Sequence, residues 1–287
     1  METLLAWLKA QLGSRMTIGA IRSLHGGESP WWIDVTAPDG SACPVVLRCP
    51  SSRIGADQIA TNAAALTVAE RHGLPAPRLI AADLDGRAAG TPASLETVVP
   101  GSSTWPAAPS VELLLAAGAA IAQVHTVTLD PRPHLPLRPR PIAVDDFAGD
   151  RRIGTMPSTA LLRLADERVR AITAPPGPVV FVHGDVWPGN TVVGDGGGVH
   201  ALIDWKTAGA GHPGVDLGEL RKQVAILYGD DDAPGHVLEG WERARGARAG
   251  DLAYWDAVAA LNTPTECYSP DATLRRDAFL RAAIARL

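Results

Sequence analysis

The pattern of hydrophobic residues changes at Pro100-Gly101, and this change limits the folds that the chain can adopt. Before it, strand-like pieces alternate with turn-forming residues, beginning with the three pieces in 17–49. After it, apolar residues recur at helical spacing over long segments. The length of 287 residues suits one large domain or two lobes that share a cleft. We predict a bilobal α+β fold, with an antiparallel sheet lobe over residues 1–100 and a mostly helical lobe over residues 101–287.

Helical spacing also predicts where the helices lie. In the first lobe, leucines of the N-terminal segment have this spacing, and a second helix over 56–72 stops before Gly73, where a positive φ suits glycine. Two strands follow, near 78–82 and near 94–99. The helices predicted for the second lobe lie at roughly 110–127, 158–172, 215–228, 236–246, 251–262 and 271–286.

Residues 128–146 contain five prolines, which exclude a regular helix and favour extended backbone. We interpret this segment as a connecting loop. A docking role for its PxxP pattern is the alternative.

Composition argues against several kinds of partner. A net charge of -5 and a pI near 5.9 do not indicate the basic surface that nucleic-acid binding requires, so no nucleic-acid partner is predicted.

The longest apolar run, 111–127, is interrupted by polar residues and is shorter than the ~20 residues that span a bilayer. Three cysteines without a CxxC pair suit a reducing compartment, and the N-terminus lacks an export signal. We predict a soluble, cytoplasmic protein with no membrane partner; nothing in the sequence indicates its oligomeric state.

The segment FVHGDVWPGN, residues 181–190, places polar residues in a tight turn directly after an apolar strand. Asp185 and Asn190 lie in it, and Asp204 follows a predicted hairpin whose turn is 195–198. Phosphoryl transfer needs one carboxylate to accept or orient the attacking hydroxyl, and an amide oxygen and a second carboxylate to hold Mg²⁺. Asp and Asn are also common turn residues, but their order after a strand favours this chemistry.

These motifs resemble those of the aminoglycoside phosphotransferase and choline kinase-like family, which has a protein kinase-like fold. HGDVWPGN corresponds to the family's HGDxxxxN loop, and IDW at 203–205 contains its second metal-binding Asp. The resemblance covers about four fifths of the chain. Its other segments are GGESP at 26–30, VVLRCP at 45–50, ALTVAERHGLPAPRLIAAD at 65–83, SLETVVPG at 94–101, VHT at 124–126 and AGHPGVDLGEL at 210–220.

The resemblance implies a role for each matching residue of the second lobe. Asp185 would be the catalytic base, with His183 either bracing it or taking part in proton transfer. Asn190 and Asp204 would bind Mg²⁺, and Asp216 would fix the catalytic loop from the following helix.

The first lobe would bind the nucleotide, ATP or alternatively GTP. Arg48 would contact the α- and β-phosphates, and Ser29 belongs to the turn that would cover them. Backbone groups near Glu96 and Val98 would hold the adenine. The expected activity is transfer of the γ-phosphoryl group to a hydroxyl of a small molecule.

Two residues depart from the family pattern. Asn62 stands on the helix where the family has a Glu that pairs with the phosphate-contacting cation, so we expect Arg48 to lack its ion pair and to donate a hydrogen bond to Asn62. Pro30 removes a backbone donor from the phosphate-covering turn. These departures keep a non-catalytic nucleotide-binding pseudo-kinase as the alternative.

The acceptor is less well defined by the sequence. Trp187 follows the base position, where its ring could stack on a sugar or fill the underside of the loop. Glu266 and other acidic residues on predicted loops suit a cationic acceptor such as an aminoglycoside or amino sugar, or form a solvated surface. The other acidic residues are Asp145, Asp146, Asp230, Asp231 and Asp232.

One rival motif, GAGHPG at 209–214, fits the dinucleotide-binding pattern GxGxxG between a strand and a helix. Pro213 inside it and the absence of a βαβαβ succession around it argue against this interpretation. The chain also lacks GxxxxGK[ST], GxSxG and HExxH, which disfavours P-loop enzymes and two hydrolase classes.

Overall fold

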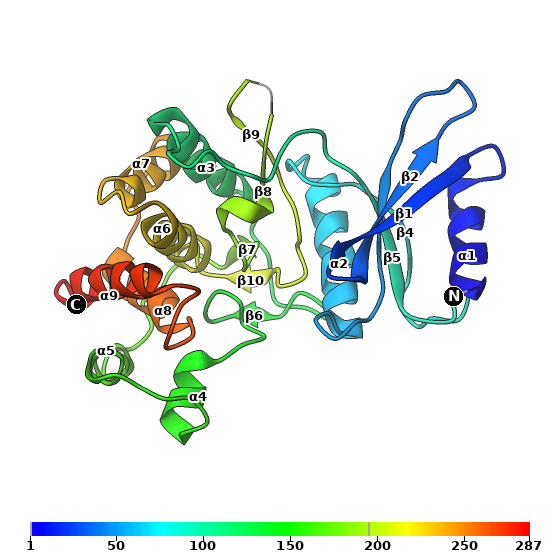
Figure 1. Ribbon diagram of the computed structural model, residues 1–287. Coiled ribbons are helices and arrows are strands. Elements are labelled where there is room, and N and C mark those ends of the chain that lie inside the picture. Colours follow the sequence, from blue (N-terminus) through cyan, green and yellow to red (C-terminus); the bar gives the residue numbers. More distant parts are fainter. Residues whose placement is uncertain (1, 195) are drawn as a thin grey trace. The chain divides into compact units, whose positions relative to one another are not determined.

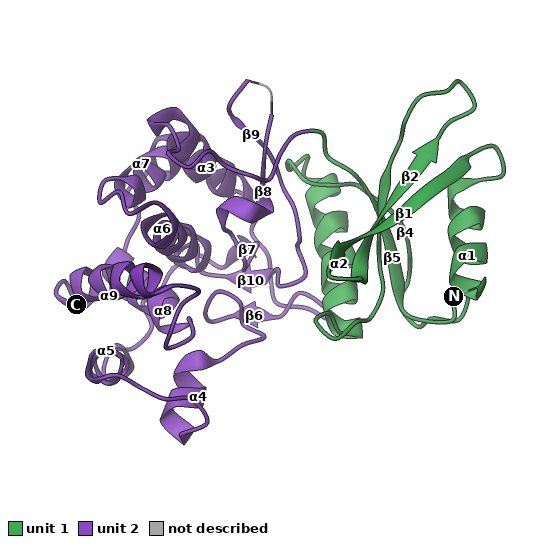
Figure 2. Ribbon diagram, in the orientation of Figure 1, with its two compact units in different colours: residues 1–100 green, residues 101–287 purple. Residues whose placement is uncertain are grey.

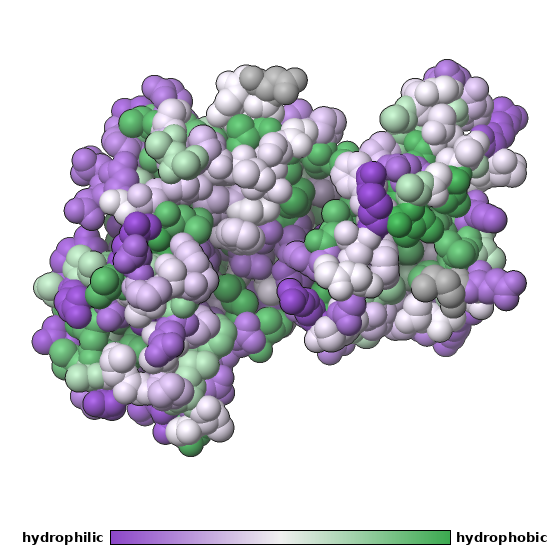
Figure 3. Space-filling view, in the orientation of Figure 1, coloured by the Kyte–Doolittle hydropathy of each residue, from purple (hydrophilic) through white to green (hydrophobic). Residues whose placement is uncertain are grey.

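A computed structural model describes residues 2–194 and 196–287. The chain forms two compact units, residues 1–100 and residues 101–287, and the division falls at Pro100-Gly101 (Figure 2). The first unit is built on an antiparallel sheet and the second is mostly helical (Figure 1). This architecture confirms the predicted α+β class. On the face drawn in Figure 3, hydrophobic residues lie scattered among hydrophilic ones over both units.

The first unit contains a five-stranded sheet in the order β1-β2-β3-β5-β4, with all neighbours antiparallel. Turn residues separate its strands as the sequence predicts, and the strands near 78–82 and 94–99 are both present. The bounds are β1 Thr17–His25, β2 Glu28–Thr36, β3 Val45–Arg48, β4 Leu79–Asp83 and β5 Ala93–Thr97.

Two helices, α1 (Glu2–Leu12) and α2 (Ala56–Arg71), cover opposite faces of this sheet (Figure 1). An apolar cluster between α1 and the sheet includes Leu8 and Leu47. Because side chains alternate along a strand, Arg48 points to the other face, where α2 lies. The sheet therefore separates an apolar core on the α1 side from a polar cluster on the α2 side.

The second unit is organised around α6 (Gly214–Tyr228), which packs against α7, α8 and α9 (Figure 1). The other helices are α3 Val111–Val124, α4 Phe147–Ile153, α5 Ala160–Arg170, α7 Ala233–Arg245, α8 Leu252–Leu261 and α9 Pro270–Ile284. Short strands and one 3-10 helix lie beside them: β6 Leu137–Arg138, β7 Val180–Val182, η1 Pro188–Asn190, β8 Thr191–Val193, β9 Val199–Leu202 and β10 Gly209–Gly211.

Two details of the second unit differ from the sequence-based expectation. Helix α4 was not predicted; it begins where the Asp146 side chain accepts a hydrogen bond from the Gly149 N–H at 2.9 Å. The proline-rich segment is a loop as predicted, but it also contains β6, which pairs in parallel with β10.

Strands β8 and β9 form the predicted hairpin, and Asp195 of its expected turn lies outside the described residues. Within residues 2–194 and 196–287, no helix combines the length and apolar character needed to cross a membrane.

Glycines allow α3 and α7 to pack with their backbones close together. A Cβ atom at Gly240 of α7 would lie 2.0 Å from the Leu115 carbonyl oxygen, and one at Gly118 of α3 would lie 2.0 Å from the Val237 carbonyl oxygen. Real Cβ atoms do not approach a backbone oxygen this closely, so a larger residue at either position would push the helices apart. This contact matters for the site described below, because α3 and α7 both contribute to it.

We predict that Gly240→Ala lowers the free energy of unfolding by about 2 kcal/mol or more, because the added methyl group overpacks the α3–α7 contact. Gly235→Ala in the same helix is the control, since a Cβ there has nothing within 4 Å. That change should be neutral or stabilise the protein by up to about 1 kcal/mol through helix propensity. Urea unfolding measures both, and equal effects of the two substitutions would refute the close packing.

Candidate active site

A buried loop follows β7 and contains His183, Gly184 and Asp185. Gly184 has φ +80°, and a Cβ atom there would lie 2.4 Å from the Thr207 carbonyl oxygen. Both the conformation and the space require glycine at this position. The sharp turn at Gly184 delivers Asp185 directly after the end of the strand.

Asp216, in the first turn of α6, fixes this loop from behind. Its carboxylate accepts hydrogen bonds from the N–H groups of His183 at 2.8 Å and Gly184 at 2.7 Å, and from His125 Nε2 at 3.1 Å. The Trp241 indole donates to His125 Nδ1 at 2.9 Å, so the imidazole proton is on Nε2. Burial alone would raise the pKa of Asp216, but these donors and the nearby histidines lower it. The loop is therefore held by a buried carboxylate in its charged form.

His183 has both ring nitrogens engaged by the backbone. Its Nε2 lies 2.9 Å from the Ile203 carbonyl oxygen, and its Nδ1 accepts from the Asp185 N–H at 3.3 Å. The side chain is fully buried, and this burial lowers the pKa of the imidazole. These contacts support the bracing role for His183 rather than direct proton transfer.

Asp185 is linked to Asn190 through its backbone and to Asp204 through a shared cation. Asn190 Nδ2 donates to the Asp185 carbonyl oxygen at 2.8 Å, which orients the amide. The ammonium of Lys206 lies 3.3 Å from Asp185 Oδ2 and also pairs with Asp204 Oδ2. One cation thus reaches both carboxylates. Burial raises the pKa of Asp185, while Lys206 acts in the opposite direction.

The backbone at Asp204 has φ +67°, a left-handed conformation that is uncommon for residues other than glycine. Such conformations cost on the order of 1 kcal/mol or more and concentrate at functional sites. This outlier is an observation that favours a functional role for Asp204 independently of its sequence motif.

The donor groups of this loop suit a hard divalent ion. Asn190 and Asp204 offer amide and carboxylate oxygens, and Mg²⁺ binds through few protein oxygens together with waters and phosphates. Over the described residues, no group of three or more His, Cys, Asp or Glu side chains could hold a metal ion. A carboxylate–amide pair fits an ion that also binds a nucleotide better than it fits a site closed by protein ligands alone.

The two predicted acceptor residues lie in different surroundings. Trp187 is 38% exposed between buried neighbours, and its ring lies against Gly189, where a Cβ atom would be 2.3 Å from an indole carbon. Glu266 is exposed and lies on the segment between α8 and α9. Among the other acidic residues, Asp146 is already used, as the cap of α4 and in ion pairs with Arg140 and Arg152.

In the first unit, Arg48 does have an ion pair, which corrects the expectation from the sequence. Its Nη2 donates to Glu96 Oε1 at 2.9 Å, and the two side chains are 6% and 3% exposed. Asn62 Nδ2 donates to the other oxygen of the same carboxylate at 2.6 Å. The carboxylate therefore comes from the neighbouring strand β5 instead of from α2, and Asn62 supports it.

The other two residues predicted to bind nucleotide are Ser29 and Val98. The buried Ser29 hydroxyl accepts a hydrogen bond from the Cys49 N–H at 2.9 Å and so ties the turn at 26–30 to the end of β3. Val98 is half-buried and follows β5 directly. Ser29 is thus bonded to the residue that follows Arg48, and Val98 lies two residues after Glu96.

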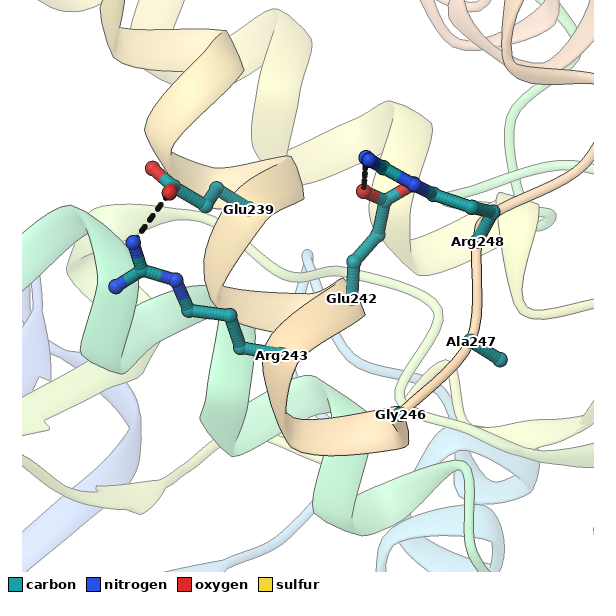
Figure 4. Close-up of a pocket in the computed structure, with 6 residues that line it drawn as sticks. All are labelled: Glu239, Glu242, Arg243, Gly246, Ala247 and Arg248. Carbon is teal, nitrogen blue, oxygen red and sulfur yellow. Dashed lines mark hydrogen bonds and ion pairs between the residues drawn. The ribbon is translucent and has the colours of Figure 1, made fainter.

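A surface cavity at the C-terminal end of α7 is separate from these residues. It has a volume of about 390 Å³ and is lined by Glu239, Glu242, Arg243, Gly246, Ala247 and Arg248. Its charged residues pair with one another, Glu239 with Arg243 and Glu242 with Arg248 (Figure 4). Because these charges compensate one another, the cavity does not favour a charged ligand.

Sequence reasoning did not single out His125, Trp241 or Lys206. His125 stands within the VHT segment of the resemblance, so a signal for it existed. Lys206 follows the IDW motif directly, but its contacts with both carboxylates are visible only in the folded loop. Trp241 belongs to a helix far along the chain, and its contact with His125 depends on tertiary packing.

The model of the phosphotransferase enzyme family matches residues 20–261. The chain belongs to this family. Solved structures with the same fold include a candidate aminoglycoside phosphotransferase from Ralstonia eutropha, with a TM-score of 0.69 and 16% identity over 99% of this chain and 97% of that one.

Two further structures share the fold of this phosphotransferase. The macrolide 2′-phosphotransferase MphH from Brachybacterium faecium has a TM-score of 0.62 and 21% identity, over 93% of this chain and 100% of that one. The amicoumacin kinase hAmiN, solved with AMP-PNP, Ca²⁺ and the ligand Ami, has a TM-score of 0.60 and 14% identity, over 98% and 93%. Comparison with curated proteins yields no match. At these identities the solved structures establish the fold alone.

We predict that Asp216→Asn lowers the free energy of unfolding by about 3 kcal/mol at neutral pH, because an amide cannot accept from all three donors. The pKa of Asp216 is lower in the folded protein, so this contribution is present above the ordinary pKa of Asp and is lost as the pH falls through the lowered value. Urea unfolding at several pH values should show the difference between wild type and variant narrowing on acidification.

The control for this experiment is Asp271→Asn, because Asp271 also lies in the first turn of a helix, α9, but is exposed. It should cost less than about 1 kcal/mol. A similar loss for both variants would mean that Asp216 acts only through the helix dipole.

A second prediction concerns the polar cluster of the first unit. Glu96→Gln should lower the free energy of unfolding by about 3 kcal/mol, since it leaves Arg48 buried without its carboxylate. Glu96→Gln combined with Asn62→Asp exchanges the amide and the carboxylate and should recover part of this loss. The comparison is made by urea unfolding, and a double variant less stable than Glu96→Gln alone would contradict the proposed arrangement.

Proposed function

We propose that this phosphotransferase is a small-molecule kinase that transfers the γ-phosphoryl group of ATP, or of GTP, to a hydroxyl group. One observation carries the proposal: Asp185 and Asp204 both contact the ammonium of Lys206, while Asn190 is hydrogen-bonded to the Asp185 backbone. A general base and two metal-binding groups are needed at one place for this chemistry. These contacts support the assignment of the three roles to Asp185, Asn190 and Asp204.

Asp185 is the proposed general base. Its carboxylate would accept the proton of the acceptor hydroxyl as the oxygen attacks the γ-phosphorus and the bond from that phosphorus to the leaving nucleotide diphosphate breaks. Burial raises the pKa of Asp185. This shift favours general-base catalysis, because a base transfers protons best when its pKa is near the working pH. The hydrogen bonds that the loop N–H groups donate to Asp216 keep the base in place.

Asn190 and Asp204 are the proposed ligands of Mg²⁺, through the amide oxygen and the carboxylate. When bound, the ion would neutralise charge on the nucleotide phosphates. The residues of the chain orient the site for it: Asn190 is held by its bond to Asp185, and the backbone of Asp204 is fixed in the left-handed region.

The first unit is the proposed nucleotide-binding part. Arg48 would contact the α- and β-phosphates, and its pair with Glu96 would hold the guanidinium in a single orientation. Ser29 positions the turn that would cover the phosphates, and backbone groups near Glu96 and Val98 would hold the base of the nucleotide.

The acceptor is proposed only as a class, a hydroxylated small molecule such as an aminoglycoside, an amino sugar or a related metabolite. The three structures with this fold are named for different acceptors, and a shared fold does not select among them. The exposed ring of Trp187, two residues after the base, supports stacking on a sugar ring. The exposed carboxylate of Glu266 suits an amino group on the same molecule.

The pseudo-kinase alternative rested on the departures at Asn62 and Pro30. One of these was the missing helix carboxylate, and Glu96 supplies a carboxylate to Arg48 from β5. This contact favours a catalytic protein over a nucleotide binder without activity.

The proposal predicts phosphoryl transfer from Mg²⁺·ATP or Mg²⁺·GTP to one member of a panel of hydroxylated amines and sugars. Asp185→Asn should lower kcat by about 100-fold or more, because the base is lost. Asp271→Asn, which changes an exposed carboxylate of the same unit, should leave kcat unchanged. Transfer is followed by mass spectrometry of the acceptor. Nucleotide binding without transfer to any acceptor would support the pseudo-kinase, and full activity of Asp185→Asn would refute the assigned base.

A further inference from the structure

Lys206 is a cation set directly between the two carboxylates of the candidate active site. It follows Asp204 by two residues on the loop between β9 and β10, and its ammonium pairs with both Asp204 and Asp185. Its side chain is only 20% exposed, so these ion pairs are partly shielded from water. Lys206 is one of three lysines among the 26 basic residues of the chain, the others being Lys9 and Lys222.

The two carboxylates need a cation whenever they are both charged. They lie close enough to share one ammonium, and like charges at such separations disfavour each other. An ammonium is a compact point charge with rotatable donors, so it can bind and leave carboxylate oxygens without the fixed planar geometry of a guanidinium.

We propose that Lys206 is a positioning residue that holds Asp185 and Asp204 together in the metal-free protein and competes with the divalent ion for the Asp204 carboxylate. This inference rests on the proposed function, since it concerns the same metal site. A divalent ion that binds Asp204 must displace the ammonium from the Oδ2 atom it now contacts. Metal binding to the free protein is therefore weaker than it would be at Asn190 and Asp204 without the ammonium.

The same competition couples the metal to the nucleotide. Phosphate oxygens are alternative partners for a displaced ammonium, so a bound nucleotide would remove the obstacle to the metal. Coupling of this kind is reciprocal: the nucleotide strengthens metal binding and the metal strengthens nucleotide binding. Lys206 would thus make the divalent ion enter with the nucleotide rather than before it.

The test measures binding of Mn²⁺, as a paramagnetic probe of the divalent site, by electron paramagnetic resonance on the full chain. Lys206→Met should bind Mn²⁺ tenfold or more tightly than wild type without nucleotide, and this gain should shrink when ADP is saturating. Lys206→Arg, which keeps the charge, should stay within about threefold of wild type. Lys9→Met, an exposed substitution on α1 with the same change of charge, should leave Mn²⁺ affinity unchanged.

Two outcomes separate this inference from the proposed function. If Asp204→Asn abolishes Mn²⁺ binding but Lys206→Met binds Mn²⁺ as wild type or more weakly, the role of Lys206 is refuted and the metal site stands. If Asp204→Asn leaves Mn²⁺ binding intact, the metal site itself is refuted. Should Lys206→Met fail to fold, Lys206→Gln removes the same charge and carries the same expectation.

Discussion

The buried carboxylate of Asp216 is the interaction on which the candidate active site depends. It accepts from two consecutive backbone N–H groups, and these define the turn at His183 and Gly184 that presents Asp185. A carboxylate is stable in the interior only when its oxygens are well satisfied, and here His125 completes the set. The position of Asp216 in the first turn of α6 adds the favourable helix dipole.

The loop also depends on how the helices pack. The Trp241 indole of α7 bonds to His125, so the loop is tied to the packing of α3, α6 and α7. A substitution that separates these helices would therefore act on Asp185 without touching it.

The polar cluster of the first unit solves a similar problem with a different residue. Arg48 is buried, and a buried guanidinium requires a carboxylate. In this chain Glu96 provides it and Asn62 satisfies the second oxygen, so the charge on Arg48 is compensated without a carboxylate on α2. What the arrangement retains is the physical requirement, a fixed cation on the last residue of β3. The carboxylate that fixes this cation lies on strand β5, whereas the resemblance implied one on helix α2.

The parts of this molecule that the sequence could predict are those that local patterns determine. The α+β class follows from the change in periodicity at Pro100-Gly101, and the loop at 181–190 follows from its residues and their order. The partner of Arg48 could not be predicted in this way, because it depends on strand register. Arg48 lies opposite Ser94, so Glu96 becomes its diagonal neighbour on the same face. Helix α4 was missed for a related reason, since it follows a proline-rich loop and begins at a cap, Asp146, rather than at a periodic apolar run.

Lys206 illustrates the same limit at the site itself. In sequence it stands two residues from Asp204, and it contacts both carboxylates from a loop whose backbone is left-handed at Asp204. That conformation costs free energy and persists only where neighbouring residues hold it. Trp205 is the residue placed to do so, because it is fully buried, stacks on Phe181 with ring centroids 5.2 Å apart, and donates to the Leu202 carbonyl oxygen at 2.9 Å. With the indole anchored between them, Asp204 and Lys206 are both directed to one point. The tryptophan of the IDW motif can thus be understood as the part that shapes the site, although it contributes no group to the chemistry.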